Sequence, residues 1–307
     1  MSMIKRIEYL EKLKKWKDKN LIKVVTGIRR CGKSTLLELF IEHLKEEKID
    51  EEHIVSINLE SLKYNFSNYK DLYFYVVSKI KEDKKYYVFL DEIQNIEGFQ
   101  KAVDIYITGS NAFLLSGELA TLLTGRYVEI KMLPLSFKEY VSGFSGNNNY
   151  QSLFLEYMKN GGMPGTISVL DLGINDINKY LDSIFSTVVF KDIMARNKIT
   201  DKTILKNIIK FILENIVYLE LLRRGYRVYV GKIDDLKIDF VAENQGGLKY
   251  FQVSRTVRDA KVLERELRLL QRTGDHYPIY LITMDMNLSS DYDGITKINV
   301  IDWLLEK

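Results

Sequence analysis

Eight consecutive residues near the start of the chain have the types and spacing needed to bind nucleotide phosphates. Residues 27–34 read Gly-Ile-Arg-Arg-Cys-Gly-Lys-Ser, which matches the pattern G-x-x-x-x-G-K-[ST] in full. In such a loop the glycines let backbone N–H groups surround phosphate oxygens, Lys33 reaches the β and γ phosphates, and Ser34 offers its hydroxyl to Mg²⁺. Lys33 is expected to face solvent until phosphate arrives. The residues predicted to bind the nucleotide are Gly27, Arg29, Arg30, Cys31, Gly32, Lys33, Ser34 and Thr35.

Two adjacent acids, Asp91 and Glu92, follow the apolar run Tyr86–Leu90. An aspartate at the carboxyl end of a strand is placed to hold Mg²⁺, often through water. The next side chain points in another direction, so Glu92 can polarise the water that attacks the γ-phosphate. Acid pairs are common on protein surfaces, and the position of this pair after a strand is what favours hydrolysis over binding alone.

A third polar segment, Gly109-Ser110-Asn111, follows a strand predicted at 104–108. A side-chain amide at the end of a neighbouring strand could contact the γ-phosphate or the attacking water. Asn111 therefore joins Glu92 among the predicted catalytic residues.

Alternating strands and helices are predicted to position these motifs. Residues 22–26 are short, apolar and β-branched, as expected of a buried parallel strand, and residues 35–44 carry apolar side chains at helical spacing. Further strands are predicted at 53–58, 86–90, 104–108 and 127–131. The alternation predicts an α/β fold with a parallel sheet covered on both faces. The strand and helix that flank the glycine loop also argue against a chance match of its pattern.

Four stretches, GIRRCGKSTLL, FLDEIQ, IYITGSNAFLLSGELATLLTGRY and LPLSFKEY, resemble one family. It comprises prokaryotic AAA-type P-loop ATPases whose C-terminal region resembles restriction-endonuclease-like domains. The resemblance implies ATP and Mg²⁺ as cofactors and makes Asn111, or its neighbour Ser110, the sensor-1 residue. It also implies that Arg126 is an arginine finger, which would act between the subunits of a homo-oligomer. The alternative for Arg126 is a surface arginine that caps a strand.

The chain is predicted to have three parts: a P-loop ATPase core at 1–133, a helical lid at 134–212 and a smaller α/β domain at 213–307. Residues 161–165, which read Gly-Gly-Met-Pro-Gly, interrupt the lid helices as in the family. Two places are shorter than in the family. Residues 92–103 are near the minimum for a parallel crossover, and no winged-helix segment precedes residue 213. Either the chain is a shortened relative or the sequence omits segments.

The C-terminal part carries a second constellation that is similar to the PD-(D/E)xK arrangement of Mg²⁺-dependent nucleases. We expect Glu214 to open a helix and Asp239 to end the strand 236–239, with Gln252 and Ser254 on the next strand. In the nuclease motif an acid and a lysine stand where Gln252 and Ser254 stand here, and serine cannot supply the missing positive charge. The prediction is a nuclease-like fold whose metal site, Glu214, Asp239 and Gln252, is degraded. An ordinary α/β domain with incidental acids is the alternative.

Cations recur at helical spacing after this constellation. Along a helix predicted at 257–272, Arg258, Lys261, Arg265, Arg268 and Arg272 form one stripe, with leucines roughly opposite. Such a stripe could follow the phosphates of a nucleic acid, whereas the usual explanation of a charged stripe is a solvated helix face.

Composition sets the broad class of protein. The chain has 307 residues, 46% of them hydrophobic, which suggests about two domains of ordinary size with real cores. Its net charge of +3 is too small to indicate a partner. The single cysteine, Cys31, predicts a cytoplasmic protein without a disulfide framework. No membrane partner is expected, because charged residues interrupt the apolar segment 204–222 and the N-terminal residues lack the pattern of a signal peptide. Cys31 is either an oxidisable thiol beside the phosphates or a small residue that the loop tolerates. The expected function is an ATPase that acts as a motor or switch on a macromolecule, with a low-turnover nucleotide switch and an ATP-dependent nuclease as alternatives.

Overall fold

The computed structural model describes residues 4–61, 63, 64, 66, 69–81, 84–92, 104–110, 126–144, 149–170, 180, 208–233, 236–273, 275–286 and 290–306. The chain forms two compact units, one comprising Met1–Leu135 with Met163–Asn197, the other Ser136–Gly162 with Lys198–Lys307. This division assigns the predicted lid region to both units. The predicted boundaries at 133 and 212 remain predictions.

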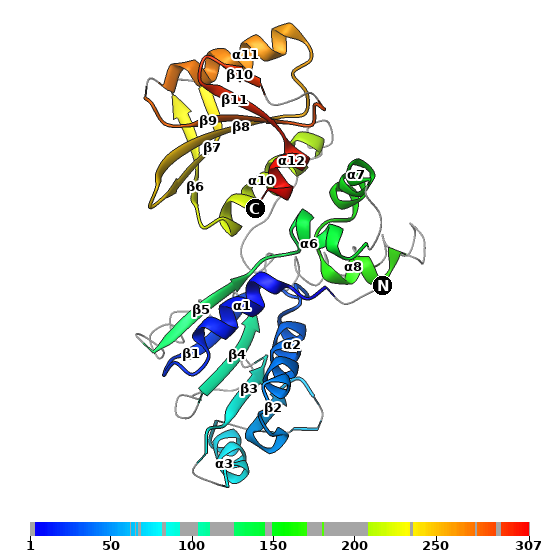
Figure 1. The fold of residues 1–307 in the computed structure, drawn as a ribbon, viewed down its shortest axis with the longest axis vertical. Coiled ribbons are helices and arrows are strands. Elements are labelled where there is room, and N and C mark those ends of the chain that lie inside the picture. Colours follow the sequence, from blue (N-terminus) through cyan, green and yellow to red (C-terminus); the bar gives the residue numbers. More distant parts are fainter. Residues whose placement is uncertain are drawn as a thin grey trace, which may run out of the picture. The chain divides into compact units, whose positions relative to one another are not determined.

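The first unit is built on a five-stranded parallel sheet in the order β2-β3-β4-β1-β5 (Figure 1). Its strands are β1 (Ile22–Gly27), β2 (Ile54–Asn58), β3 (Tyr87–Asp91), β4 (Asp104–Ser110) and β5 (Tyr127–Met132). The predicted parallel sheet is confirmed, and each strand lies within two residues of its predicted range.

Both faces of this sheet are covered. One face packs against α1 (Ile7–Trp16) and α2 (Lys33–Glu46) through Tyr9, Leu13, Phe40 and their neighbours. The other face packs against α3 (Tyr69–Lys79) through Leu72 and Val76. Successive side chains of a strand point to opposite faces, so near-continuous apolar strands are required for two covered faces. The unit also contains the 3₁₀ turn η1 (Glu51–His53) and α8 (Pro164–Ser168).

The second unit contains a six-stranded mixed sheet in the order β10-β11-β9-β8-β7-β6. In chain order its elements are α6 (Phe137–Ser142), α7 (Tyr150–Asn160), α10 (Ile208–Arg223), β6 (Arg227–Ile233), β7 (Leu236–Asn244), β8 (Gly247–Ser254), α11 (Ala260–Leu270), η6 (Gln271–Thr273), β9 (Ile279–Thr283), β10 (Ser290–Tyr292), β11 (Ile295–Asn299) and α12 (Val300–Leu305). Strands β6, β7 and β8 are antiparallel, whereas β9 returns parallel to β8 after α11.

Two expectations for this unit were wrong in detail. Glu214 lies inside α10 and does not open it, because the apolar helical pattern extends back to Ile208. Asp239 lies in the middle of β7 and does not end it, because Phe240–Asn244 continue to pair with β8. In the part of the chain that the structure describes, no helix has the length and apolar character needed to cross a membrane.

Candidate nucleotide-binding site

The glycine loop joins the carboxyl end of β1 to the first turn of α2, as its sequence pattern predicts. The loop turns through left-handed backbone conformations at Arg30 (φ 65°) and Gly32 (φ 95°). Gly27 (φ 153°) is required for a second reason, because a Cβ atom there would lie 2.4 Å from the carbonyl oxygen of Met132 and 2.8 Å from the Cys31 sulfur. The end of β5 therefore passes too close to the loop for any side chain at position 27.

Lys33 is buried, which corrects the expectation that it faces solvent. Its side chain is 4% exposed, and Nζ donates hydrogen bonds to the carbonyl oxygens of Gly27 (3.2 Å) and Ile28 (3.1 Å). The physical reason is that an ammonium group inside the loop needs acceptors, and loop carbonyls supply them where no phosphate is present. Lys33 is thus already folded into the position from which it can exchange carbonyl oxygens for phosphate oxygens.

Cys31 packs as a small buried residue. It is 0% exposed, its Sγ lies 3.9 Å from the carbonyl oxygen of Met132, and burial raises the pKa of its thiol. A buried, protonated thiol is a poor nucleophile, so of the two alternatives for this residue the structure favours a small side chain that the loop tolerates.

The carboxylate of Asp91 is held at the end of β3 by both neighbouring strands. Its Oδ1 accepts a hydrogen bond from the Thr108 hydroxyl on β4, and its Oδ2 accepts one from Asn58 Nδ2 on β2 at 3.3 Å. Thr108 Oγ1 also accepts the backbone N–H of Glu92 at 3.0 Å, and Glu92 adopts a left-handed backbone (φ 56°) that few non-glycine residues populate. Thr108 therefore holds both the carboxylate of Asp91 and the backbone of Glu92.

Sequence reasoning missed Asn58 and Thr108. The available signal was their place at the carboxyl ends of predicted parallel strands, where side chains from adjacent strands converge. Asn58 stands directly opposite Asp91 in the register of β2 and β3.

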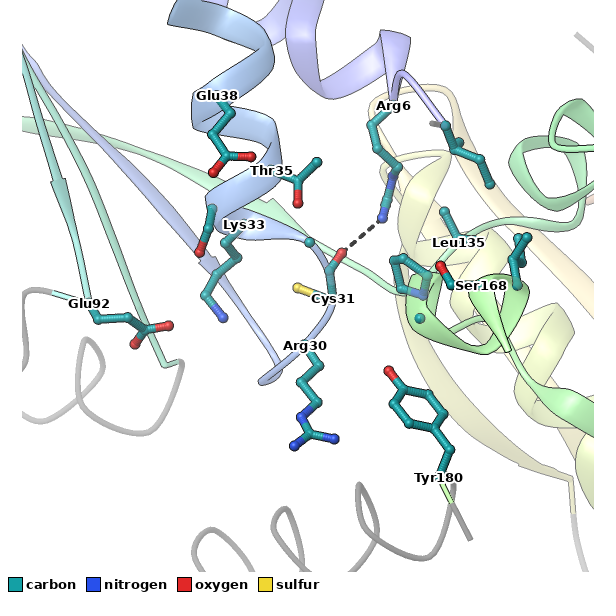
Figure 2. Close-up of a pocket in the computed structure, with 16 residues that line it drawn as sticks. Arg6, Arg30, Cys31, Lys33, Thr35, Glu38, Glu92, Leu135, Ser168 and Tyr180 are labelled. Carbon is teal, nitrogen blue, oxygen red and sulfur yellow. Dashed lines mark hydrogen bonds between the residues drawn. The ribbon is translucent and has the colours of Figure 1, made fainter. Parts of the chain in front are cut away.

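A cavity of about 670 Å³ adjoins the loop (Figure 2). Six of the predicted nucleotide-binding residues line it, namely Arg30, Cys31, Gly32, Lys33, Ser34 and Thr35, and Glu92 lines it as well. Its remaining wall is formed by Ile4, Arg6, Glu38, Leu135, Pro164, Gly165, Ile167, Ser168 and Tyr180. Figure 2 shows Glu92 on one side of the loop and Arg6, Leu135 and Ser168 on the other. The cavity thus combines a polar loop with an apolar side, as nucleotide sites do.

Other predicted site residues either lie outside the described residues or do not line the described cavity wall. Asn111 lies outside the described residues, as does the side chain of Ser110. Arg29 is directed to Glu60, 3.4 Å away, and does not belong to the described cavity wall. Arg126 is exposed at the amino end of β5, where its carbonyl oxygen accepts the N–H of Ile22 at 2.9 Å. Because β1 and β5 are parallel, Arg126 and the loop lie at opposite ends of the sheet, so Arg126 cannot contact a nucleotide bound to its own loop.

In the second unit, Asp239 and Gln252 face each other on β7 and β8 in a buried hydrogen-bonded chain. Gln252 Oε1 accepts the N–H of Asp239 at 3.1 Å, and Gln252 Nε2 donates to Glu266 Oε2 at 2.9 Å. Asp239 Oδ2 in turn accepts the N–H of Val253 at 2.9 Å. Both ends of the Gln252 amide are therefore hydrogen-bonded to protein groups.

Glu214 is half-buried on α10, and Glu266, which sequence reasoning missed, comes from α11. Within the described residues no three His, Cys, Asp or Glu side chains are grouped so that they could hold a metal ion.

Comparison with known proteins gives a family context for the chain. Residues 19–141 match the model of an AAA domain. An uncharacterized protein of Haemophilus influenzae is 33% identical to the chain over 403 aligned positions, which cover 99% of each protein. Since the chain has 307 residues, the relative carries additional segments that this chain lacks. An uncharacterized protein of Methanocaldococcus jannaschii is 31% identical over 205 residues, covering 59% of this chain and 43% of that protein.

A solved structure gives a weaker match. The Walker-type ATPase of Pyrococcus abyssi aligns with 98% of this chain and 95% of its own, at 16% identity and a TM-score of 0.40.

Proposed function

The chain belongs to the family of the Haemophilus influenzae protein and carries an AAA-type ATPase domain, and from this premise we propose that it binds ATP with Mg²⁺, hydrolyses it, and acts as a switch or motor on a macromolecular partner. The observation that carries the proposal is the cavity in which Lys33, Ser34 and the carboxylate of Glu92 come together. Lys33 supplies a cation for the phosphates, Ser34 supplies a hydroxyl ligand for Mg²⁺, and Glu92 supplies a general base for the attacking water.

Lys33 and the loop N–H groups would bind the phosphates, with Lys33 releasing the carbonyl oxygens of Gly27 and Ile28 as it does so. The oxygen donors Ser34 and Asp91 fit Mg²⁺, which prefers carboxylate and hydroxyl oxygens. When bound, Mg²⁺ would neutralise charge on the β and γ phosphate oxygens. Asn58 and Thr108 keep the Asp91 carboxylate in one orientation for this purpose.

The apolar side of the cavity suits the base of the nucleotide. Ile4, Leu135, Pro164 and Ile167 line it, and Pro164 lies next to the loop, since a Cβ atom on Gly32 would be 3.6 Å from Pro164 Cγ. A flat aromatic base gains free energy by leaving water for such a surface.

The proposal is tested by Lys33→Ala, which should abolish measurable ATP–Mg²⁺ binding in calorimetry while the far-UV circular dichroism spectrum stays unchanged. The loop would then lack its only predicted ammonium group for the β and γ phosphates. Lys45→Ala, at an exposed cation of the same helix, is the matched control and should bind ATP as the unaltered protein does. Unchanged affinity in Lys33→Ala would show that the loop is not the phosphate site.

We further propose that the C-terminal region has a nuclease-like fold that binds nucleic acid without cutting it. The order α10, antiparallel β6-β7-β8, α11 and parallel β9, with Asp239 opposite Gln252, supports the fold. The engagement of both Gln252 amide ends by protein groups argues against the nuclease alternative.

The predicted basic stripe supports nucleic acid as the partner. Its members Arg258, Lys261, Arg265, Arg268 and Arg272 are all exposed, and α11 packs its other side through Leu263, Leu267 and Leu270. Arg258 pairs with Asp285 at 3.3 Å and Arg265 with Glu266 at 2.7 Å. Lys261 and Arg268 form no ion pair with the described residues, so they are available to phosphates.

Reversing Lys261 and Arg268 to Glu should weaken DNA or RNA binding and reduce the slope of log K against log salt by about one for each phosphate that the protein no longer binds. Reversing Lys232 and Lys237, an exposed pair on β6 and β7, changes the net charge equally and should leave both quantities unchanged. Fluorescence anisotropy across a salt series measures them. Equal effects of the two reversals would identify the stripe as a solvated face, and Mg²⁺-dependent cleavage that is abolished in Asp239→Ala would refute the non-cutting proposal.

A further inference from the structure

Arg6, a residue to which the sequence motifs give no role, joins the N-terminal segment (residues 4–16) to the glycine loop (residues 27–34), which is the proposed phosphate loop. It precedes α1, is only 4% exposed and has a left-handed backbone (φ 46°). Its guanidinium donates from Nη1 to the carbonyl oxygen of Cys31 at 3.1 Å, which is the bond drawn in Figure 2, and from Nη2 to the carbonyl oxygen of Leu133 at 2.7 Å. One side chain thus holds two segments that frame the cavity.

Tyr9 strengthens this junction. Its hydroxyl accepts the N–H of Leu133 at 3.1 Å, and its ring lies 4.7 Å from the Arg6 guanidinium carbon, within the range of a cation–π contact. Both backbone groups of Leu133 are therefore bound by the N-terminal segment. Two residues later Leu135 lines the cavity, as do Ile4 and Arg6 themselves.

The bond to Cys31 constrains the orientation of the loop backbone. A trans peptide unit is planar, so the direction of a carbonyl group sets the direction of the N–H group of the next residue. Holding the Cys31 carbonyl oxygen therefore holds the Gly32 N–H, one of the donors that the loop motif offers to phosphate. Gly32 has no side chain to restrict its own backbone, so this orientation depends on outside contacts.

Arginine suits this task better than lysine. Its planar guanidinium presents several donors in a fixed geometry and can bind two carbonyl oxygens at once, whereas an ammonium group at the end of a flexible chain is not oriented in this way. Burial of the charge is tolerable because both carbonyl oxygens are directed at it.

We propose that Arg6 is a positioning residue for nucleotide binding, and that the N-terminal segment sets the phosphate loop in its binding geometry before the nucleotide arrives. This inference rests on the proposed ATP site. It assigns to Arg6 an effect on affinity and not on the chemical step, since Arg6 contacts the loop from behind the Cys31 carbonyl and the water-activating acid Glu92 lies on the other side of the loop.

Two measurements on Arg6→Ala test the inference. Amide hydrogen exchange of a peptide covering residues 27–34 should be faster in the nucleotide-free variant, with exchange of β3 and β4 unchanged. The Kd for ATP should rise about tenfold or more, because the nucleotide-free loop would then adopt its binding geometry only about a tenth of the time or less. The kcat at saturating ATP should change by less than about twofold. Arg6→Lys should give an intermediate Kd and, together with Tyr9→Phe, carries the test if Arg6→Ala does not fold.

Tyr87→Phe is the matched control for a general loss of stability. It removes the hydrogen bond of 2.8 Å from the Tyr87 hydroxyl to Asp18 Oδ1 at the opposite end of the same sheet. It should leave loop exchange and the Kd for ATP unchanged. Unaltered loop exchange and unaltered Kd in Arg6→Ala, or equal effects in Tyr87→Phe, would overturn the inference. Failure of the proposed ATP site is a separate outcome, which would appear as normal ATP binding by Lys33→Ala. In that case the hydrogen-exchange measurement on Arg6→Ala would still decide whether Arg6 holds the loop.

Discussion

Glu92→Gln is expected to slow ATP hydrolysis by about 10² to 10⁴-fold, the usual contribution of a positioned general base, while ATP binding is retained. The amide has nearly the shape of the carboxylate but cannot accept a proton from the attacking water. Because Thr108 binds the backbone N–H of Glu92, the side chain at this position should keep its direction in the variant. Single-turnover hydrolysis and calorimetry measure the two properties separately.

Glu42→Gln, at an exposed acid on α2, makes the same chemical change away from the cavity and should hydrolyse ATP at the unaltered rate. Wild-type turnover in Glu92→Gln would assign water activation to another residue. If the unaltered protein itself turned over ATP as slowly as the variant, the low-turnover switch would be the better description of its function.

We also propose that Arg126 acts on the nucleotide of a neighbouring copy, and the Glu92→Gln protein can be used to test this. Arg126 is exposed and lies at the opposite end of the sheet from its own loop, so only a second chain could use it. Arg126→Ala should lose turnover, and mixing it with Glu92→Gln should restore part of it, because some mixed interfaces then pair an intact Glu92 with an intact Arg126. Absence of recovery, with a monomer in light scattering, would contradict the proposal.

Asp104→Ala is expected to lower the free energy of unfolding by about 3–5 kcal/mol, the range measured when one partner of a buried ion pair is removed. Asp104 is the counterion of Lys23, whose side chain is 0% exposed on β1. Asp104 also accepts hydrogen bonds from the Tyr106 hydroxyl (3.2 Å) and from the N–H of Asp18 (3.1 Å). Its removal leaves a buried ammonium with one remaining described acceptor, the carbonyl oxygen of Lys19 at 2.7 Å. Urea denaturation measures the change.

The pH dependence of this destabilisation has a definite sign. Burial lowers the pKa of Lys23 in the folded protein, and the hydrogen bond and charge of Asp104 oppose that shift. Without Asp104 the folded-state pKa should fall further below its unfolded value, so between the two values the unfolded chain binds more protons and stability rises with pH. The loss in the free energy of unfolding that Asp104→Ala causes should therefore be smaller near pH 10 than near pH 7.

A double replacement, Lys23→Met with Asp104→Leu, removes both charges and is the matched control. It should recover most of the stability, because no buried charge is left without a partner. If the double replacement lost as much free energy of unfolding as Asp104→Ala does, the hydrogen bonds to Asp104, and not the buried charge of Lys23, would account for most of the destabilisation.

Several features of this protein follow from local sequence. The strands of the parallel sheet and the glycine loop between β1 and α2 were predictable because a buried strand needs a continuous apolar run and a phosphate loop needs glycines at set positions. Asp91 and Glu92 could be assigned because they directly follow such a run. The stripe on α11 was equally readable, since helical geometry brings residues three and four apart to one face.

Only the tertiary structure decided which distant groups complete these motifs. Asn58 and Thr108 reach Asp91 because parallel strands place their carboxyl ends at one edge of the sheet, and Arg6 reaches Cys31 because α1 packs beside α2 on the same face. Glu266 meets Gln252 in the same way, through the packing of α11 on the second sheet. Lys33 was expected in solvent and is buried, because the acceptors around it come from the folded path of its own loop. A hydrogen bond between residues far apart in the chain leaves no periodic signal in the sequence, so its partners are set by the strand order and the packing of the helices on the sheet.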